Sequence, residues 1–380
     1  MVAEADFTCH PNVGVQYLCV PSPTPANIEA DFYEVSAAAP PTATPISLEL
    51  SRRESALSCS TSIQSKTKKF SPRICSGSDT HIGSRSSNED EHVQIDDLCA
   101  HLGTIYKWSE SGSFYAVFDG HGGADAAAYM KNNATKLFFE DAELPQTSDI
   151  DEKFLQDLES CHRKSFLLAD RALADENSAV DSYCGTTALT ALVLGRNLLI
   201  ANAGDSRAVL CRRGVAIQLS QDHRPSCQVE QKRVEDLGGT IEDGYLNGEL
   251  AVTRALGDWY MKLPFGSASP LTAEPEFQRT FLTEEDEFLI LGCDGIWDVI
   301  SNQDAVRLVR RELRHHNDPQ HCAKELINEA LQRGTRDNVT AIVVCFSSPK
   351  SQDSVPSERP RFRLLSEEAQ KKLRGLLPGN

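Results

Sequence analysis

Two segments of the chain place an aspartate directly after a run of apolar residues. They read "FYAVFDGHGG", residues 114–123, and "EFLILGCDGIWD", residues 287–298. A carboxylate at the end of a buried strand is costly to desolvate unless turn amides or a cation compensate it. A single Asp-Gly of this kind is explained by an Asx turn. Two of them indicate that both carboxylates need the same kind of compensation for their buried charge.

Further acids occupy similar positions. "ANAGDSRAV" contains Asp205, "RGTRDNVTAIVV" contains Asp337, and "SRSSNEDEH" contains Glu89 and Asp90. Where the ends of neighbouring strands converge, carboxylates would raise one another's pKa. Divalent cations remove that repulsion, and ligation by oxygen alone favours magnesium or manganese over zinc. The sequence therefore predicts a magnesium or manganese site, with these candidate ligands at strand ends: Asp119, Asp205, Asp294, Asp298 and Asp337.

The elements that position these acids are short apolar runs bounded by Gly, Asp and Asn. Their length and β-branched content predict strands. Helices are predicted from Ala124 onward, over residues 151–173, where apolar residues recur every three or four positions, and after Ser301, whose "SNQD" resembles a capping box. Strands with grouped helices favour an α+β fold, an antiparallel β-sandwich with helices outside. The predicted strands contain "FYAVF", "TALTALVLGRNLLIANAG", "RAVLCRRG", "EFLILG" and "VTAIVVCF".

The composition changes along the chain and divides it into three parts. Residues 1–78 are dominated by Pro, Ser, Thr and Ala, which predicts a disordered segment. Residues 79–347 are expected to form one domain with a flap insert at about 223–274, where "VEQKRVEDLGG" predicts a short helix and two turn dipeptides predict a hairpin. Residues 348–380 form a tail with one short amphipathic helix expected.

Composition also excludes several classes of protein. At 380 residues and 40% hydrophobic, the chain can bury a large core, yet it has no apolar run of about 20 residues and no secretory start. A net charge of −17 argues against nucleic acid as a partner. The 12 cysteines include no Cys-x-x-Cys pair, so we expect reduced thiols in the cytoplasm or nucleus. We also expect a monomer without a membrane span.

Seven segments in order resemble the metal-dependent protein phosphatases, the type 2C serine/threonine family, in the style of its plant members. The segments are "SRSSNEDEH", "FDGHGG", "YCGTTAL", "ANAGDSRAVL", "ELAVTRALGD", "CDGIWDV" and "RDNVTAIVV", and they cover about residues 79–346. The resemblance implies a central antiparallel β-sandwich flanked by helices on both sides, in four layers α-β-β-α. It also implies two Mn²⁺ or Mg²⁺ ions at one end of the sandwich.

The resemblance assigns the ligands by motif. Asp119 would bridge both ions, and Gly120 would lend its backbone carbonyl, which the missing Cβ leaves accessible. Asp294 and Asp337 would be the other direct ligands. Four further acids are implied nearby: Glu89 and Asp90 acting mainly through bound water, and Asp205 and Asp298 at a third, weaker ion.

The implied reaction is hydrolysis of phosphoserine and phosphothreonine in proteins. Two metal ions can share and acidify a water, which would attack phosphorus without a phosphoenzyme. Arg85 is the candidate for binding phosphate through its guanidinium fork, the alternative being a surface arginine. His121 is the candidate general acid for the leaving alkoxide, the alternative being that it orients Asp119 or water.

Some roles and functions stay open. Arg254 is expected to pair with Asp258, the alternative being a place near the active site. Thr187 either bonds a metal-bound water or packs in its strand, and Trp297 is expected to anchor a turn in the core. The alternative function is an inactive relative that regulates by binding phosphoproteins or kinases; the three acids of the metal motif favour activity. A calcium-responsive protein would need a twelve-residue ligand loop that the chain lacks. Protein kinases are expected among the partners.

Overall fold

The computed structural model describes residues 70–142, 144–145, 150–175, 180–262 and 268–346. Most of the expected disordered N-terminal segment and all of the expected C-terminal helix lie outside these residues. The first strand begins at Cys75, four residues before the expected start of the domain, because it pairs along its whole length with the last strand.

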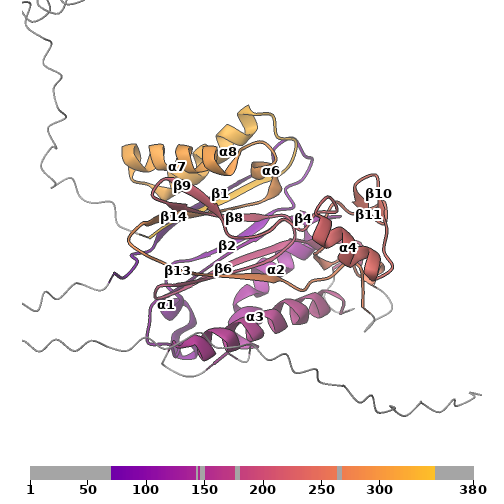
Figure 1. The fold of residues 1–380 in the computed structure, drawn as a ribbon, viewed down its shortest axis with the longest axis horizontal. Coiled ribbons are helices and arrows are strands. Elements are labelled where there is room, and N and C mark those ends of the chain that lie inside the picture. The colour runs from indigo at the N-terminus through magenta and orange to yellow at the C-terminus, as the bar shows by residue number, and fades with distance from the viewer. Residues whose placement is uncertain (1–69, 143, 146–149, 176–179, 263–267, 347–380) are drawn as a thin grey trace, which may run out of the picture. The chain divides into compact units, whose positions relative to one another are not determined.

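Two five-stranded antiparallel sheets form the centre of the described body (Figure 1). The first sheet has the order β1 (Cys75–His81), β15 (Val339–Cys345), β14 (Asp286–Gly292), β8 (Arg207–Arg212) and β9 (Val215–Gln218). The second has the order β13 (Glu276–Phe281), β7 (Asn197–Ala203), β6 (Ala188–Leu194), β3 (Gly112–Phe118) and β2 (Glu91–Ile95). The predicted sandwich is confirmed.

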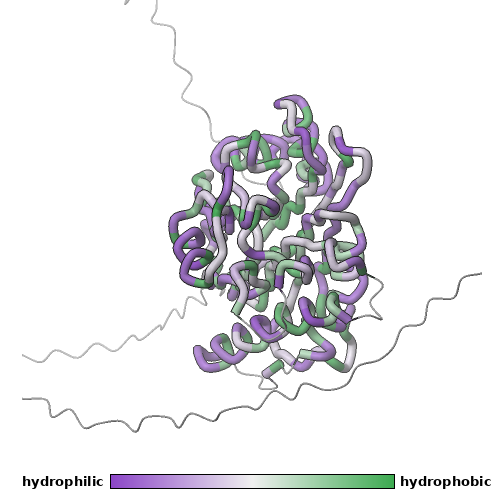
Figure 2. Tube along the Cα trace, turned by 90° about the vertical axis from the view of Figure 1, so that its right-hand side faces the viewer, coloured by the Kyte–Doolittle hydropathy of each residue, from purple (hydrophilic) through white to green (hydrophobic). Residues whose placement is uncertain are grey.

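The core between the sheets follows from the two-residue period of a strand. In β3, Tyr115 and Val117 face the first sheet, whereas Phe114 and Phe118 face the helices on the other side. In β14, Leu289 and Leu291 complete the inner layer. Because interior strands are buried on both faces, most of their residues are apolar, and Figure 2 shows hydrophobic segments mainly inside the body and hydrophilic ones mainly around it.

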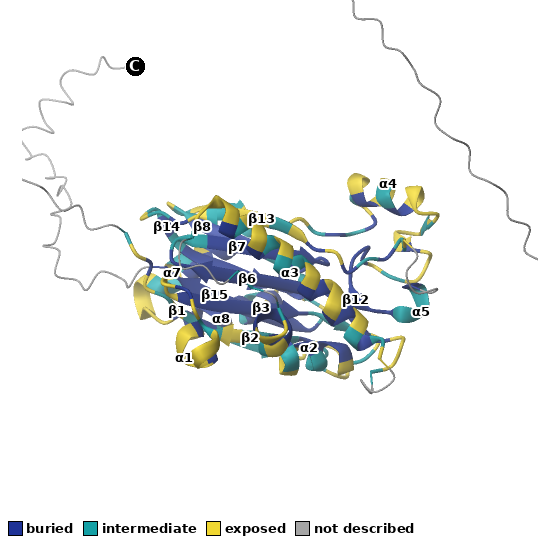
Figure 3. Ribbon diagram, turned by 90° about the horizontal axis from the view of Figure 1, so that it is seen from below, coloured by how far each residue is buried: buried dark blue, intermediate teal, exposed yellow. Residues whose placement is uncertain are grey.

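Helices cover the outer face of each sheet. The helices α1 (Leu98–Leu102), α2 (Asp125–Thr135) and α3 (Glu152–Leu173) lie on the second sheet, and a π-helix at Lys136–Glu140 continues α2. Figure 3 shows α3 with its exposed residues turned away from the buried strands. The helices α7 (Asn302–His316) and α8 (Pro319–Gln332) lie on the first sheet and complete the four layers.

Two of the predicted helix starts are confirmed by their caps. The Asp151 side chain accepts a hydrogen bond from the Phe154 amide at 2.7 Å, and the Ser301 hydroxyl accepts one from the Asp304 amide at 3.2 Å. These bonds satisfy backbone donors that have no partner within the helix. By contrast, α8 was not predicted. The described residues also contain three short helical segments, at Gly103–Ile105, α5 (Trp259–Lys262) and α6 (Asp294–Trp297).

The predicted flap insert is present beside one end of the sandwich (Figure 1). It contains α4 (Gln228–Asp236) and the hairpin of β10 (Ile241–Glu242) with β11 (Tyr245–Leu246). At the hairpin turn, Asp243 and Gly244 have φ of 51° and 86°, as a type I′ turn requires. A small hydrophobic core of its own stabilises the flap: Val234, Leu246, Val252, Ala255 and Leu271.

A three-stranded sheet connects the flap to the body, in the order β12 (Leu256–Gly257), β5 (Gly185–Thr186) and β4 (Gly120–His121). Among the described residues, no helix combines the length and the apolar character that a membrane span needs. The described cysteines are all free thiols.

Candidate active site

Strand ends from both sheets meet at a cleft of about 260 Å³ beside the flap. Asp119 follows β3 of the second sheet, whereas Asp205, Asp294 and Asp337 adjoin β8, β14 and β15 of the first. Because β14 is antiparallel to both its neighbours, its end at Gly292 lies beside the starts of β8 and β15. The topology therefore brings these acids together, as the sequence predicted.

Three of the carboxylates are close enough to bind the same metal ion. Asp119, Asp205 and Asp294 each offer an oxygen, and these oxygens lie within 4.8 Å of one another. Burial, followed by the charges of neighbouring acids, raises the pKa of Asp119 well above its usual range. Burial and the nearby Asp205 and Asp298 raise the pKa of Asp294 to about 8. Such a cluster is stable in ionised form only with added positive charge.

A fourth carboxylate lies beneath this cluster. Asp90 is 3% exposed; its Oδ2 accepts a hydrogen bond from the Thr340 hydroxyl at 2.7 Å, but its Oδ1 has no hydrogen-bond partner. Burial raises the pKa of Asp90 to about 6. The neighbouring Cys293 is a buried thiol whose pKa is raised well above its usual range by burial and the nearby acids, so it stays protonated. The donors are thus carboxylate oxygens, which suit Mg²⁺ or Mn²⁺.

Gly120 fits the cleft for a steric reason. A Cβ at this position would lie 2.4 Å from the Glu89 backbone oxygen, so a side chain would push the 82–89 loop out of place. Glu89 also lines the cleft, and its Oε2 accepts a hydrogen bond from the Gly123 amide at 3.3 Å. The predicted reason for glycine was the approach of its carbonyl to a metal ion; close packing adds a second reason.

Arg85 lies at the mouth of the cleft with its side chain 57% exposed. Its Nη2 donates a hydrogen bond to Asp337 Oδ2 at 2.6 Å. The Asp337 carboxylate holds the pKa of Arg85 above its usual value, so the guanidinium is charged. A guanidinium has five N–H donors in a fork, so this one bond leaves donors for a phosphate at the cleft mouth.

His121 is paired with Asp258, the carboxylate that the sequence predicted as a partner of Arg254. His121 Nε2 lies 2.7 Å from Asp258 Oδ2, and Asp258 is 1% exposed. Both His121 and Gly257 face Gly185 in the small sheet. A Cβ on Gly185 would come within 2.4 Å of His121 Nε2 and 2.0 Å of Asp258 Oδ2, so this glycine makes room for the pair.

The predicted ion pair between Arg254 and Asp258 is wrong. Arg254 Nη2 instead binds Glu230 Oε1 at 2.6 Å and Glu276 Oε1 at 3.0 Å. The reason is the pairing of β12, which follows Arg254 and carries Asp258 toward β4 and away from the arginine.

Sequence reasoning did not identify Arg224. Its guanidinium contacts three of the predicted metal-site acids: Asp205 at 2.9 Å, Asp294 at 3.1 Å and Asp298 at 2.9 Å. Although burial opposes it, these carboxylates raise the pKa of Arg224, so it is charged. The signal for this residue was indirect, since an excess of converging acids requires a cation and "QDHRPS" stands at the start of the flap insert.

Asn338 was also missed, although it follows Asp337 in a motif used for the prediction. Its Nδ2 donates to the backbone oxygens of Ile82 and Ser87 at 2.8 and 2.9 Å, and its Oδ1 accepts from the Glu89 amide at 2.9 Å. One buried side chain thus holds the loop that carries Arg85 and Glu89 against the start of β15. An amide suits this work because it both donates and accepts.

The two remaining predicted residues are buried. Thr187 Oγ1 accepts a hydrogen bond from the Asp119 amide at 3.3 Å and lies 3.1 Å from Ser206 Oγ, so it supports the backbone of Asp119. Trp297 is confirmed as a core residue, and its Nε1 donates to the Gly292 oxygen at 2.9 Å. The segment that it anchors is the helix α6 and not the expected turn.

Comparison with known proteins shows which family the chain resembles in sequence. The profile of the family described as Protein phosphatase 2C matches residues 76–339. "Probable protein phosphatase 2C 13" of Arabidopsis thaliana is 55% identical over 336 residues, which cover 88% of this chain and 87% of that protein. "Probable protein phosphatase 2C 47" of Oryza sativa subsp. japonica is 60% identical over 287 residues, covering 76% and 74%.

A solved structure shows the same fold. The crystal structure of serine-threonine phosphatase 2C from Toxoplasma gondii superimposes with a TM-score of 0.60 at 22% identity, and the match covers 73% of this chain and 98% of that chain. At this identity the similarity supports the architecture of the two sheets and their helices.

Proposed function

This chain belongs to the protein phosphatase 2C family, and we propose that the cleft at the strand ends is its active site. The protein is a metal-dependent serine/threonine phosphatase that acts on phosphoproteins. One observation carries the assignment of the site: carboxylates from separate strand ends of both sheets converge where Arg85 and His121 line the same cleft.

The proposed ligands are the acids that the motif predicted. Asp119, the Gly120 carbonyl, Asp294 and Asp337 would hold two Mn²⁺ or Mg²⁺ ions. When bound, the ions neutralise the carboxylates and acidify water for attack on phosphorus. Four acids at the edge of this set would act through water or hold a third, weaker ion: Glu89, Asp90, Asp205 and Asp298.

The other proposed roles belong to side chains of the chain itself. Arg85 binds the phosphate oxygens at the cleft mouth, where its charge and its fork of donors are available. His121 protonates the leaving alkoxide. The Asp258 carboxylate accepts from His121 Nε2, so it stabilises the imidazolium and leaves Nδ1 for the leaving group. The flap forms one wall of the cleft through residues 249–252 and Tyr245, and it would contact the protein substrate.

The regulatory alternative, an inactive relative, finds no support in this geometry. Such a protein would be expected to have lost one of its metal-site acids, whereas Asp119, Asp294 and Asp337 all line the cleft.

We also propose that the protein works as a monomer in the cytoplasm or nucleus, with protein kinases among its phosphorylated partners. The free thiols of the described cysteines support a reducing compartment. Light scattering after size-exclusion chromatography checks the monomer, and a dimer mass would contradict it.

The test of the active site is hydrolysis of a phosphothreonine peptide with Mn²⁺, before and after chelation. Asp119→Asn keeps the shape of the side chain and removes a ligand charge, so we expect turnover to fall by at least about 100-fold. The matched control is Asp157→Asn, an identical substitution on the exposed side of α3, which should retain full turnover. Equal turnover of Asp119→Asn and the control would overturn the assignment.

A further inference from the structure

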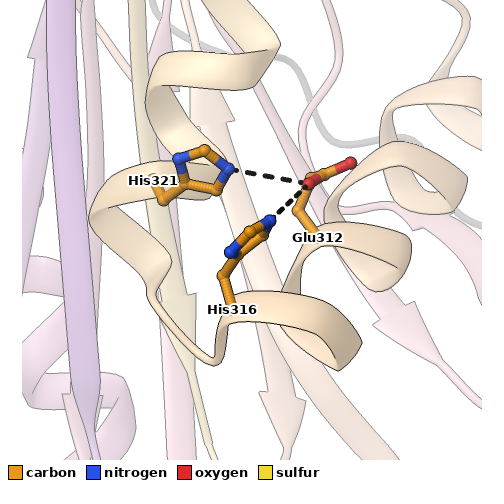
Figure 4. Close-up of side chains that lie close together, drawn as sticks. All are labelled: Glu312, His316 and His321. Atoms are coloured by element: carbon orange, nitrogen blue, oxygen red, sulfur yellow. Dashed lines mark ion pairs between the residues drawn. The ribbon is translucent and has the colours of Figure 1, made fainter.

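Three side chains at the junction of α7 and α8 converge away from the cleft (Figure 4). His316 Nε2 lies 3.7 Å from Glu312 Oε2, and His321 Nε2 lies 3.6 Å from the same oxygen. One potential ligand atom from each residue lies within 4.8 Å of the others. Two imidazoles and a carboxylate therefore face one small volume.

Local structure explains this convergence. Glu312 and His316 are four residues apart in the last turns of α7, so they share a face of the helix. Asn317 ends α7 with φ of 55°, and Asp318 caps α8, so the chain turns within two residues. His321 then falls in the first turn of α8 and lies against His316, with their ring centroids 4.3 Å apart.

The two distances suit a shared ion better than hydrogen bonds. An N–H···O hydrogen bond has its heavy atoms about 2.7–3.2 Å apart, so contacts of 3.6 and 3.7 Å are too long. Two ligands bound about 2.0–2.1 Å from a tetrahedral zinc ion lie about 3.3–3.4 Å apart. Shifts of a few tenths of an ångström would bring each nitrogen to that spacing from the Glu312 oxygen, and the two imidazole rings already lie beside each other.

The carboxylate is prepared to act as a ligand. Glu312 Oε1 accepts a hydrogen bond from Arg311 Nε at 2.8 Å, which orients the group and leaves Oε2 toward both imidazoles. The site also lies at the carboxyl end of α7, where the helix dipole favours a cation.

We propose that Glu312, His316 and His321 form a zinc site that is distinct from the active site and fastens α7 to α8. Imidazole ligands suit zinc, whereas the carboxylate cleft suits Mg²⁺ or Mn²⁺. Water would fill the remaining position of the tetrahedron. The cluster lies at the far end of α7, which starts four residues after Asp298 and spans about 22 Å, and none of its three residues lines the cleft. Its role is to stabilise the helical layer on the first sheet.

The experiment is a zinc titration of the full chain by calorimetry with the cleft saturated by Mn²⁺. We expect one zinc equivalent to bind wild type, and His316→Ala and His321→Ala each to weaken that binding by at least about 100-fold. The matched control is His315→Ala, a neighbouring histidine on α7 outside the cluster, which should bind like wild type.

Two further measurements separate this site from zinc bound in the cleft. Cu²⁺ bound to the wild type and to His315→Ala should show splitting from two nitrogens in its paramagnetic resonance spectrum, and His316→Ala should show splitting from at most one. The phosphatase activity with Mn²⁺ should be equal in all variants, which also shows that they fold. If wild type and His316→Ala bind zinc with the same stoichiometry and affinity, the three residues form only ion pairs and the proposal fails.

Discussion

Two groups of acids in this molecule show how the same carboxylate behaves with and without a partner. At the base of the flap, Glu230 is 2% exposed and bonds to Arg254 and Arg233. Burial opposes ionisation there, but the hydrogen bonds from these arginines and from Thr253 lower the pKa of Glu230 to about 2. In the cleft, burial and neighbouring acids raise the pKa of Asp294 to about 8.

The comparison separates structural from functional acids. Both groups are removed from water, so desolvation alone does not distinguish them. The charge of Glu230 in the flap is neutralised by arginines of the chain. In the cleft, the total negative charge of the acids exceeds the positive charge that Arg224 provides. Groups whose pKa is strongly shifted in a cleft are candidates for function, because a bound ligand must supply the compensating charge that the chain lacks there.

The largest expected effect comes from breaking the neutralised group. Glu230→Gln removes the buried carboxylate that pairs with Arg254 and leaves this arginine only the more exposed Glu276, so we expect a loss of about 3–5 kcal/mol in the free energy of unfolding. Urea unfolding measures it. The control is Glu235→Gln, an exposed position of the same helix, where a change under about 0.5 kcal/mol is expected.

The pH dependence of this loss has a definite sign. The folded pKa of Glu230, about 2, lies below the value of about 4.3 in an unfolded chain. Its contribution to stability is therefore complete above pH 4.3 and is lost as the pH falls toward 2. Wild type and Glu230→Gln should converge in stability over that range, and a constant difference down to pH 2 would contradict the pairing.

The second expected effect concerns Asp258, a buried carboxylate whose partner is His121. Asp258→Asn keeps the shape and removes the charge that stabilises the imidazolium. We expect turnover of a phosphothreonine peptide to fall about 10–100-fold. An aryl phosphate, whose leaving group needs no proton, should lose much less. Equal losses on both substrates would show that Asp258 does not act through proton transfer.

The smallest expected effect is a gain in stability. Asp294→Asn replaces a group that the metal-free cleft must bind in protonated form by one that is neutral in the folded and unfolded states, so the metal-free variant should be more stable than wild type at pH 7 by on the order of 1 kcal/mol. Because the folded pKa of Asp294 is raised, the free energy of unfolding of the metal-free wild type falls, relative to the variant, as the pH rises from about 4 to 8. Thermal unfolding with chelator at pH 5 and pH 8 measures the gain, which should be larger at pH 8.

Excess Mn²⁺ should reverse that order by stabilising wild type through binding. A variant that is less stable than wild type with chelator present would show that Asp294 is not under repulsion.

The sequence predicted the interior of the sandwich better than its borders. Strands such as β3 and β15 are buried on both faces, so their apolar runs were visible in the sequence. The border strands β1, β2, β9 and β13 were missed because half or more of their residues are not buried, and "EFQRTF" of β13 has no apolar run. Pairing with a neighbour, which no local pattern records, makes them strands.

The same limit applies to the site. Acids after apolar runs marked the cleft, because a desolvated charge is unusual enough to read from one chain. Arg224 and Asn338 were missed because they act through tertiary contacts with residues far along the chain. The error on Arg254 has the same origin, since Asp258 is near in sequence but β12 turns it toward His121.

The origin of the acids in two different sheets has a mechanical consequence. Asp119 follows a strand of one sheet and Asp294 follows a strand of the other. Their separation therefore depends on the packing of the buried cluster between the sheets, which contains Val117 and Leu291. A slip of one layer by a fraction of an ångström would mis-space the oxygens for a small ion before it unfolded anything. Substitutions that enlarge or truncate side chains deep in the sandwich should therefore alter which metal ion the enzyme prefers. The hydrophobic interior thus influences the metal site without contacting it.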